Sequence, residues 1–382
     1  MSAGVRFDVC IVGAGPAGAA AAIVLARGGA RVVIADRAVF PREKVCGDGV
    51  LPDAIAVMDE LGVPPRPPLA ARSPGLAMRT ASGREVRFDV PGVVIRRRDL
   101  DQALLDAAIA AGAEFLAGHT LAELRDEGGV GCRVGLSAEG RTVRAEAAAV
   151  LVATGAAPGP ARLAGLAPRS RPGAALRGYA AVSGRSPDTL LIALLSELRR
   201  GYAWAFPGPG GVWNVGAGVF AGARGTARLG QALERFLASL GGRWLERPRG
   251  APLLTGFGCS PFVRGRVALV GEAAGLTRPF SGEGIGPSVR SGVVAGTCLL
   301  AQGGGAGLLD YQRRLITEYR RDFRAWRFGE RLLAHPALVD RIVARAVKFP
   351  GALGRCAGVL GGTNPAARVL SPVGLLRLLV GR

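Results

Sequence analysis

Histidine and lysine are nearly absent from this chain of 382 residues, which contains two of each. Two histidines and six cysteines, none of them at CxxC spacing, exclude the common protein zinc sites. Aromatic residues make up only 5%, and no basic run interleaves with them, which excludes the usual nucleic-acid modules. No uninterrupted apolar run reaches the length of a membrane-spanning helix. The scattered cysteines indicate reduced thiols, so we expect a cytoplasmic protein that binds no metal.

Arginine and glycine are abundant instead. The formal net charge is +20, and residues 311–382 carry 14 Arg or Lys against 4 Asp or Glu. Distributed arginines are attracted to anionic lipid head groups, so we expect peripheral contact with the inner face of a membrane rather than binding to nucleic acid. Ordinary helix packing with a solvated basic face explains the same charge equally well.

The first motif lies near the N-terminus, where residues 7–37 read FDVCIVGAGPAGAAAAIVLARGGARVVIADR. The pattern predicts a buried strand over 8–12, a helix over 17–26 and a second strand over 32–35. The glycines form GxGxxG, which permits a tight turn and brings a pyrophosphate to the helix N-terminus. The acid that ends the second strand is placed to bind ribose hydroxyls. The predicted cofactor-binding residues here are Gly13, Gly15, Ala17, Gly18, Asp36 and Arg37.

A second motif, in residues 267–292, favours FAD over NAD. An apolar strand over 267–270 runs into Gly271 and Glu272, and a helix is predicted to start near Gly284. A carboxylate at a strand end can hold the hydroxyls of an extended chain, and a helix N-terminus can face the anionic ring of a reduced flavin. A glycine-rich connection without a ligand is the alternative.

Two further stretches contain residues that could contact a substrate. FPREKVCGDGVLP, residues 40–52, places Cys46 beside backbone-exposing glycines, with Lys44 positioned to stabilise a thiolate. In YAWAFP, residues 202–207, three rings alternate with alanines and therefore share one face of a strand, with a turn at 208–211 leading to a partner strand. Burial is the alternative for the cysteine, and core packing is the alternative for the rings.

These motifs together resemble the FAD enzymes related to p-hydroxybenzoate hydroxylase, and a third motif, Arg97-x-x-Leu100-Asp101-x-x-Leu104, supports the resemblance. The stretches FPRxKxCGDG, YxWxFP and PFSGEGI (279–285) are similar to those of the geranylgeranyl reductase family. The resemblance covers roughly residues 5–300. It implies bound FAD, reduction of isoprenoid double bonds and a two-domain flavoprotein with a helical C-terminal part.

The resemblance also implies roles for individual residues. It assigns flavin binding to Lys44, Arg97, Gly271, Glu272, Pro279, Gly282, Gly284 and Ile285. It assigns the wall of the substrate site to Tyr202, Trp204, Phe206 and Pro207, and catalysis to Cys46 and Asp48. Cys46 is expected beside the reacting carbon, as a proton donor or as a positioning group. Two departures stand out: Glu272 replaces the usual Asp, and Thr154 replaces an Asp that helps hold cofactors in hydroxylases. The second departure argues mildly against a hydroxylase.

We therefore expect an α/β protein with a discontinuous Rossmann-like FAD-binding domain and a substrate domain built on a mixed or antiparallel sheet. The predicted FAD-binding segments are 1–70, 95–165 and 250–310, the substrate-domain segments are 71–94 and 166–249, and residues 311–382 form a helical C-terminal region.

The expected function is reduction of carbon–carbon double bonds in a prenyl (geranylgeranyl-type) lipid by hydride transfer from reduced FAD. An external electron donor is required, and NAD(P)H and ferredoxin are both open. One alternative is an FAD monooxygenase acting on an aromatic or polyketide lipid. The other is a flavin- or lipid-binding protein without turnover.

Overall fold

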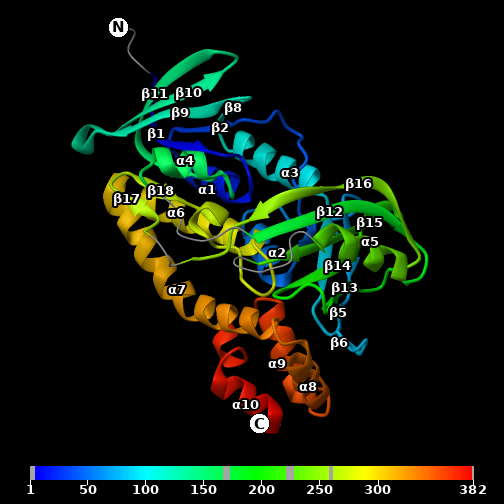
Figure 1. Cartoon of the computed structure of the whole chain (residues 1–382). Helices are drawn as coiled ribbons and strands as arrows, with labels where there is room; N and C mark the ends of the chain where they lie inside the picture. The colour runs from blue at the N-terminus through cyan, green and yellow to red at the C-terminus, as the bar shows by residue number, and fades with distance from the viewer. Residues whose placement is uncertain (1–4, 167–172, 221–227, 258–260, 381–382) are drawn as a thin grey trace.

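A computed structural model describes residues 5–166, 173–220, 228–257 and 261–380. Two large β-sheets lie side by side, and a series of consecutive helices leads from the first sheet to the C-terminus (Figure 1). The predicted α/β class is confirmed. So is the prediction of a Rossmann-like sheet accompanied by a second, mixed sheet.

The first sheet contains the dinucleotide unit. Its parallel strands, in spatial order, are β18 (Val267–Leu269), β11 (Arg141–Val152), β1 (Val5–Val12), β2 (Val32–Asp36) and β8 (Glu114–Ala117). Helix α1 (Pro16–Arg27) joins β1 to β2, which confirms the predicted strand–helix–strand order. A Cβ at Gly18 would lie 1.9 Å from the carbonyl oxygen of Gly13, so only glycine allows this close approach.

Smaller elements complete this part of the molecule. The antiparallel strands β9 (Thr120–Asp126), β10 (Cys132–Ala138) and β17 (Val263–Arg264) extend the first sheet. A separate three-stranded sheet consists of β3 (Gly49–Val50), β4 (Ala70–Ser73) and β7 (Gly92–Ile95). Three helices accompany them: α2 (Pro52–Glu60), α3 (Arg97–Ala110) and α4 (Pro158–Leu163).

The second sheet has seven strands. Their spatial order is β16 (Gly242–Leu253), β12 (Gly173–Val182), β15 (Trp213–Val219), β14 (Gly201–Pro207), β13 (Leu190–Ala193), β5 (Leu76–Arg79) and β6 (Glu85–Phe88). All pairs are antiparallel except β13 with β5. Helix α5 (Leu229–Ser239) buries Leu233 and Phe236 against one face. The predicted hairpin is confirmed, since β14 and β15 pair across a short 3₁₀ turn at Pro209–Gly211.

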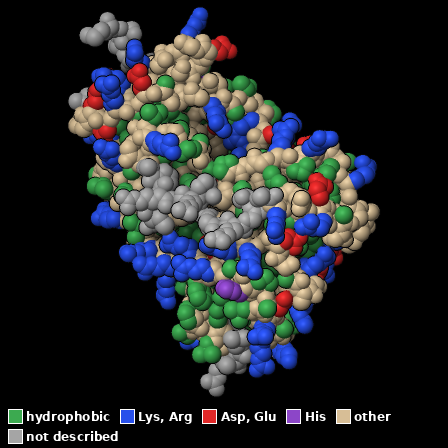
Figure 2. Space-filling model, in the orientation of Figure 1, with side chains coloured by type: hydrophobic (Ala, Val, Ile, Leu, Met, Phe, Trp, Pro, Cys, Tyr) green, Lys and Arg blue, Asp and Glu red, His purple; other side chains and the backbone are tan. Residues whose placement is uncertain are grey.

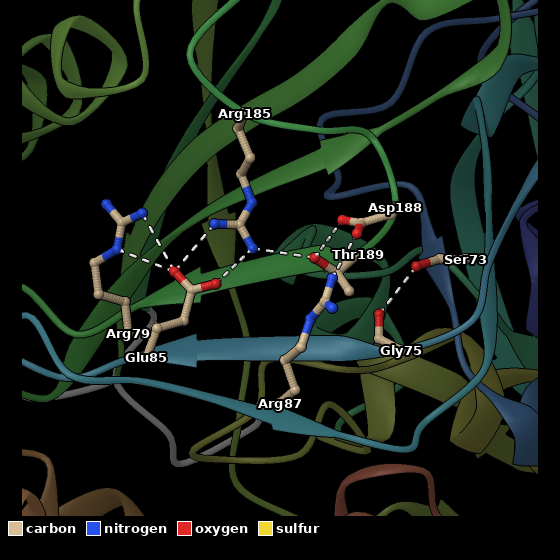
Figure 3. Close-up of polar contacts among 8 residues, drawn as sticks. All are labelled: Ser73, Gly75, Arg79, Glu85, Arg87, Arg185, Asp188 and Thr189. Carbon is tan, nitrogen blue, oxygen red and sulfur yellow. Dashed lines mark hydrogen bonds and ion pairs between the residues drawn. The ribbon is translucent and has the colours of Figure 1, made fainter.

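Ion pairs hold the β5–β6 edge against the loop that precedes β13 (Figure 3). Glu85 on β6 accepts hydrogen bonds from both Arg79 on β5 and Arg185 in the loop, at 2.8 to 3.4 Å. Beside it, Arg87 donates to Asp188 at 2.6 Å. These exposed pairs add little stability individually. They link the edge of the sheet to the loop before β13, and β5 and β13 both contribute side chains to the site described below.

The C-terminal part is helical, as expected. Its helices are α6 (Ile285–Gln302), α7 (Gly304–Leu332), α8 (Pro336–Ala346), α9 (Pro350–Leu360) and α10 (Pro372–Val380). The buried Tyr311 hydroxyl donates to the Leu269 carbonyl at 2.9 Å and so anchors α7 to the first sheet. Among the described residues, no helix is both long and apolar enough to cross a bilayer.

Candidate active site

A cavity of about 960 Å³ lies between the two large sheets. Its walls include the GxGxxG turn, the 42–49 loop, strand β14 and the segment that leads into α6. The volume is at the upper end of the range for small-molecule sites. The sequence motifs that are far apart in the chain therefore meet around one space.

The GxGxxG turn forms one wall. Gly13 has φ +107°, and a Cβ there would lie 2.5 Å from the Ala153 carbonyl oxygen. Asp36, at the end of β2, accepts the backbone N–H of Ala14 at 2.8 Å and that of Ala38 at 2.9 Å. Its buried carboxylate thus shapes the turn and still faces the cavity, where a second lone pair on each oxygen is available to a hydroxyl.

Two buried polar atoms in this wall have no hydrogen-bond partner among the described residues: Arg42 Nη1 and Thr154 Oγ1. Arg42 Nη2 pairs with Asp101 at 2.9 Å and lies 3.7 Å from the position that a Cβ on Gly15 would occupy. Buried donors without partners are costly, so their presence indicates a ligand that supplies acceptors. Anionic phosphates at the N-terminus of α1 meet that requirement. The residues of this wall therefore fit the pyrophosphate of FAD.

Arg97, at the start of α3, connects the cofactor wall to the cysteine. Its guanidinium forms a two-point pair with the fully buried Asp101, at 2.8 Å for both contacts. The same guanidinium lines the cavity together with Cys46. Burial is the largest single influence and lowers the pKa of Arg97, but the charge of Asp101 and the other nearby groups together raise it by more, so the net direction is upward. Arg97 is therefore a fixed cation beside Cys46.

Lys44, by contrast, pairs with Glu272. Its Nζ lies 3.7 Å from Glu272 Oε2, and Glu272 Oε1 accepts the Leu254 N–H at 3.1 Å. The role of Lys44 in stabilising a Cys46 thiolate stays a prediction: both residues line the cavity, and the ion pair that the structure gives for Lys44 is the one with Glu272. Glu272 lies in the cavity wall as predicted for its motif, and Gly271 is required because a Cβ there would lie 2.8 Å from the Ala17 Cβ.

Asp48 is the centre of a buried hydrogen-bond network. Its Oδ2 accepts from the Tyr179 hydroxyl and from Asn214 Nδ2, both at 2.7 Å. Asn214 also donates to the Cys46 carbonyl at 2.9 Å and accepts from Trp204 Nε1 at 2.8 Å. Burial raises the pKa of Asp48 to about 6, against the lowering influence of Arg177 and the two hydrogen bonds. Asp48 therefore positions the cysteine loop and the aromatic wall together.

A second buried arginine ties the loop to the substrate sheet. Arg177 on β12 donates to the Lys44 carbonyl at 2.9 Å and to the Cys46 carbonyl at 3.1 Å. Its guanidinium also lies 4.3 Å from the centre of the Tyr179 ring. The backbone of the loop is thus held from β12 and β15, both strands of the other sheet.

The aromatic wall lies directly against the cysteine loop. Tyr202, Trp204 and Phe206 all line the cavity, as their alternation predicts. A Cβ at Gly47 would lie 3.4 Å from both the Trp204 and the Phe206 rings, and one at Gly49 would lie 3.1 Å from Phe206. The glycines on either side of Asp48 therefore leave the space that these rings occupy.

The cavity also has an extended apolar wall. It is formed by Leu51, Leu76, Leu190, Ile192, Phe206 and Leu360, which come from the 40–52 segment, three strands and α9. Apolar walls exclude water and accept hydrocarbon. The site can therefore hold a polar dinucleotide and an apolar chain in one connected space.

The predicted site residues divide into two groups. Four of them do not line the cavity: Gly18 and Gly271 permit close packing behind it, and Pro207 and Pro279 lie beside lining residues. The others all line it: Gly13, Gly15, Ala17, Asp36, Arg37, Lys44, Cys46, Asp48, Arg97, Tyr202, Trp204, Phe206, Glu272, Gly282, Gly284 and Ile285.

Sequence reasoning missed Arg42, Glu283 and Asn214. The first two lie inside stretches singled out for other residues, FPREK and SGEGI, and could have been found there. Asn214 could have been found from the hairpin register, since it lies opposite Phe206. Arg177 carries no sequence signal that links it to residues 44–46.

Comparison with known sequences agrees with this geometry. The model for the FAD binding domain matches residues 6–164. Menaquinone reductase of Mycolicibacterium smegmatis is 32% identical over 362 residues, covering 88% of this chain and 86% of the relative. Digeranylgeranylglycerophospholipid reductase 1 of Methanopyrus kandleri is 33% identical over 308 residues, covering 76% and 80%.

Comparison with solved structures supports the fold. A geranylgeranyl bacteriochlorophyll reductase-like protein from Thermoplasma acidophilum has a TM-score of 0.81 at 20% identity, covering 99% of this chain and 96% of the other. The flavin-dependent brominase Bmp2 has a TM-score of 0.75 at 17% identity, covering 98% and 97%. At these identities the likeness concerns the fold alone, which reductases and halogenases share.

Proposed function

The chain belongs to the geranylgeranyl reductase family of FAD-dependent oxidoreductases, and on that premise we propose that it reduces carbon–carbon double bonds of a prenyl lipid. The observation that carries the proposal is the single cavity, in which a dinucleotide cradle continues into an apolar wall. An aromatic hydroxylation site would need polar groups to orient a ring, whereas this wall is suited to a long hydrocarbon chain.

Different residues of the cavity bind the cofactor and the prenyl chain. Arg42, Asp36 and the N-terminus of α1 would hold the dinucleotide, which when bound and reduced would provide a hydride. Trp204 and Phe206 exclude water and orient the prenyl chain. An isolated alkene has no carbonyl to carry developing charge, so a dry and fixed cavity is required. Cys46, held by Asn214 and Arg177 through its carbonyl, contacts the chain beside the reacting double bond.

Anaerobic reoxidation tests the reductase proposal. The FAD-loaded protein is reduced with dithionite and mixed with prenyl quinones, diphosphates or glycerol ethers. We expect flavin reoxidation and a mass gain of two hydrogens per reduced bond. Reoxidation that requires oxygen and adds oxygen to the lipid would instead establish a monooxygenase. No reaction with any prenyl class would leave a binding protein.

The role of Cys46 has its own test. Cys46→Ser should slow reoxidation by the lipid, whereas Cys132→Ser, at a cysteine outside the cavity wall, should not. Equal rates in both variants would remove Cys46 from the reaction site. The electron donor is proposed to be external, NAD(P)H or ferredoxin, and stopped-flow reduction with each of the two distinguishes them.

We further propose peripheral binding to an anionic membrane through the C-terminal helices. Figure 2 shows a band of Arg and Lys side chains below the grey segments, where Figure 1 places α7. Exposed apolar side chains lie further along the same C-terminal region: Val373 and Leu376 on α10 are 60% and 61% exposed, and Leu338 on the neighbouring α8 is 43% exposed. Basic residues around inserted apolar side chains are typical of membrane-surface helices.

Vesicle sedimentation tests this surface. Val373→Asp with Leu376→Asp should abolish binding to phosphatidylglycerol vesicles, and high salt should weaken it in the wild type. Val143→Asp is the matched control, because Val143 is 45% exposed on β11, in the first sheet. Equal loss of binding in the control would refute a specific C-terminal contact.

A further inference from the structure

Glu283 is a buried carboxyl group in the wall of the cavity. It lies in the segment before α6, and its side chain is 6% exposed. Its Oε1 accepts the Gly286 N–H at 2.7 Å, and its Oε2 lies 3.1 Å from Arg278 Nη1. The cofactor and substrate roles assigned above do not use this group.

Two carboxylates share the one guanidinium. Arg278 also pairs with Asp53 on α2 at 2.5 Å, and its own side chain is 9% exposed. One buried and one partly buried carboxylate beside one cation leave a net negative charge, which one bound proton removes. Glu283 is the more buried acid, since the Asp53 side chain is 19% exposed, so the proton resides on Glu283.

The surrounding groups agree with that assignment. Burial, with the charge of Asp53, raises the pKa of Glu283 to about 7, although Arg278 and the N–H groups of Ile285 and Gly286 act in the opposite direction. The other titratable groups nearby are phenols: Tyr319 from α7 acts on Arg278, and Tyr202 faces Glu283 from β14. Glu283 can therefore hold a proton near neutral pH and release it.

Glu283 also lies close to the expected reaction position. Tyr202, Cys46 and Glu283 all line the cavity, and burial raises the pKa of the Tyr202 phenol, with further raising by the charges of the other two groups. The Tyr202 hydroxyl donates to the Ser281 carbonyl, and a Cβ at Gly282 would lie 3.0 Å from that hydroxyl. Cys46 and Glu283 therefore act on the same part of the cavity.

We propose that Glu283 is the catalytic acid of the reduction, an inference that rests on the proposed function. Reduced flavin supplies the hydride and its two electrons to one alkene carbon, and the Glu283 O–H bond breaks to give a proton to the other. Two C–H bonds form, the flavin is oxidised, and the carboxylate recovers its proton from water.

Glu283→Gln tests the proposal in the FAD-loaded protein. We expect reoxidation by a prenyl lipid to slow by about 100-fold or more, the range for loss of a general acid. The wild-type rate should fall above about pH 7, and the variant should lack this dependence. Glu330→Gln is the matched control, since Glu330 is another buried carboxyl paired with an arginine but lies outside the cavity wall.

Infrared spectroscopy provides a readout without turnover. Between about pH 6 and pH 7, where Asp48 is largely ionised, the wild type should show a carboxylic acid C=O component that Glu283→Gln lacks and Glu330→Gln retains. If the wild type is active and Glu283→Gln keeps the same rate and pH profile, the role of Glu283 is overturned while the proposed function stands. Absence of the band would overturn the same role. A wild type that reduces no prenyl lipid would overturn the proposed function itself.

Discussion

Replacing Asp48 by Asn should make the protein more stable at neutral pH, although the substitution removes a buried charge beside an arginine. Asp48 is 1% exposed, and its Oδ1 is buried without a hydrogen-bond partner among the residues described. Asn keeps an acceptor for Tyr179 and Asn214 and is neutral, like the protonated acid. The substitution therefore preserves the network and removes the pH-dependent cost of ionisation.

The magnitude follows from the pKa gap. The pKa of Asp48 rises from 3.8 to about 6 on folding because of burial. Two pKa units correspond to about 3 kcal/mol. Since the folded-state pKa is raised, the fold favours the protonated acid. This stabilisation is complete below about pH 4 and is lost as the pH rises through 6.

Urea unfolding between pH 4 and pH 8, in excess FAD, measures the effect as a difference between Asp48→Asn and wild type. The difference should be near zero at pH 4 and should grow to about 3 kcal/mol in favour of the variant above pH 7. Asp59→Asn, at an exposed position on α2, serves as the control for loss of one surface carboxylate. A variant that is less stable than wild type at pH 8 would refute the reasoning, because Arg177 would then outweigh burial.

Three further outcomes are expected. Arg42→Ala should weaken FAD binding by about tenfold to 100-fold in a fluorescence titration, because a charge-assisted phosphate contact is lost; unchanged affinity would remove that contact. Gly18→Ala should lower the unfolding free energy by about 1–3 kcal/mol through the 1.9 Å clash with a neighbouring carbonyl, whereas Gly129→Ala, with open space around its Cβ, should not. Asn214→Leu should slow lipid-dependent reoxidation and shift the Trp204 fluorescence, because the indole N–H loses its buried acceptor; an unaltered spectrum would contradict the network.

The dinucleotide unit could be predicted because its constraints are local. The strand, turn, helix and second strand follow each other within residues 5–36, and the glycines act on neighbours in the chain. The alternation of rings in β14 likewise fixes a common face without knowledge of the partner. These are the parts of the site in which sequence spacing determines geometry.

The contacts that hold the cysteine loop could not be predicted in the same way. Arg177 and Asn214 reach residues 44–48 across more than 130 positions of sequence. Periodicity within β12 and β15 says which side chains share a face, but not which loop from another sheet lies on that face. The same limit applies to Arg97, which reaches the cavity wall that it shares with Cys46 from a helix that is distant in sequence.

The link between the cysteine loop and the substrate sheet has a consequence for how such proteins diversify. Residues 44–48 belong to the N-terminal segment, yet their backbone is held by Arg177 and Asn214 of the second sheet. A recombination event that exchanged the second sheet alone would sever these bonds and misplace the loop. A chimaera with a new substrate pocket must therefore carry the loop together with the two strands.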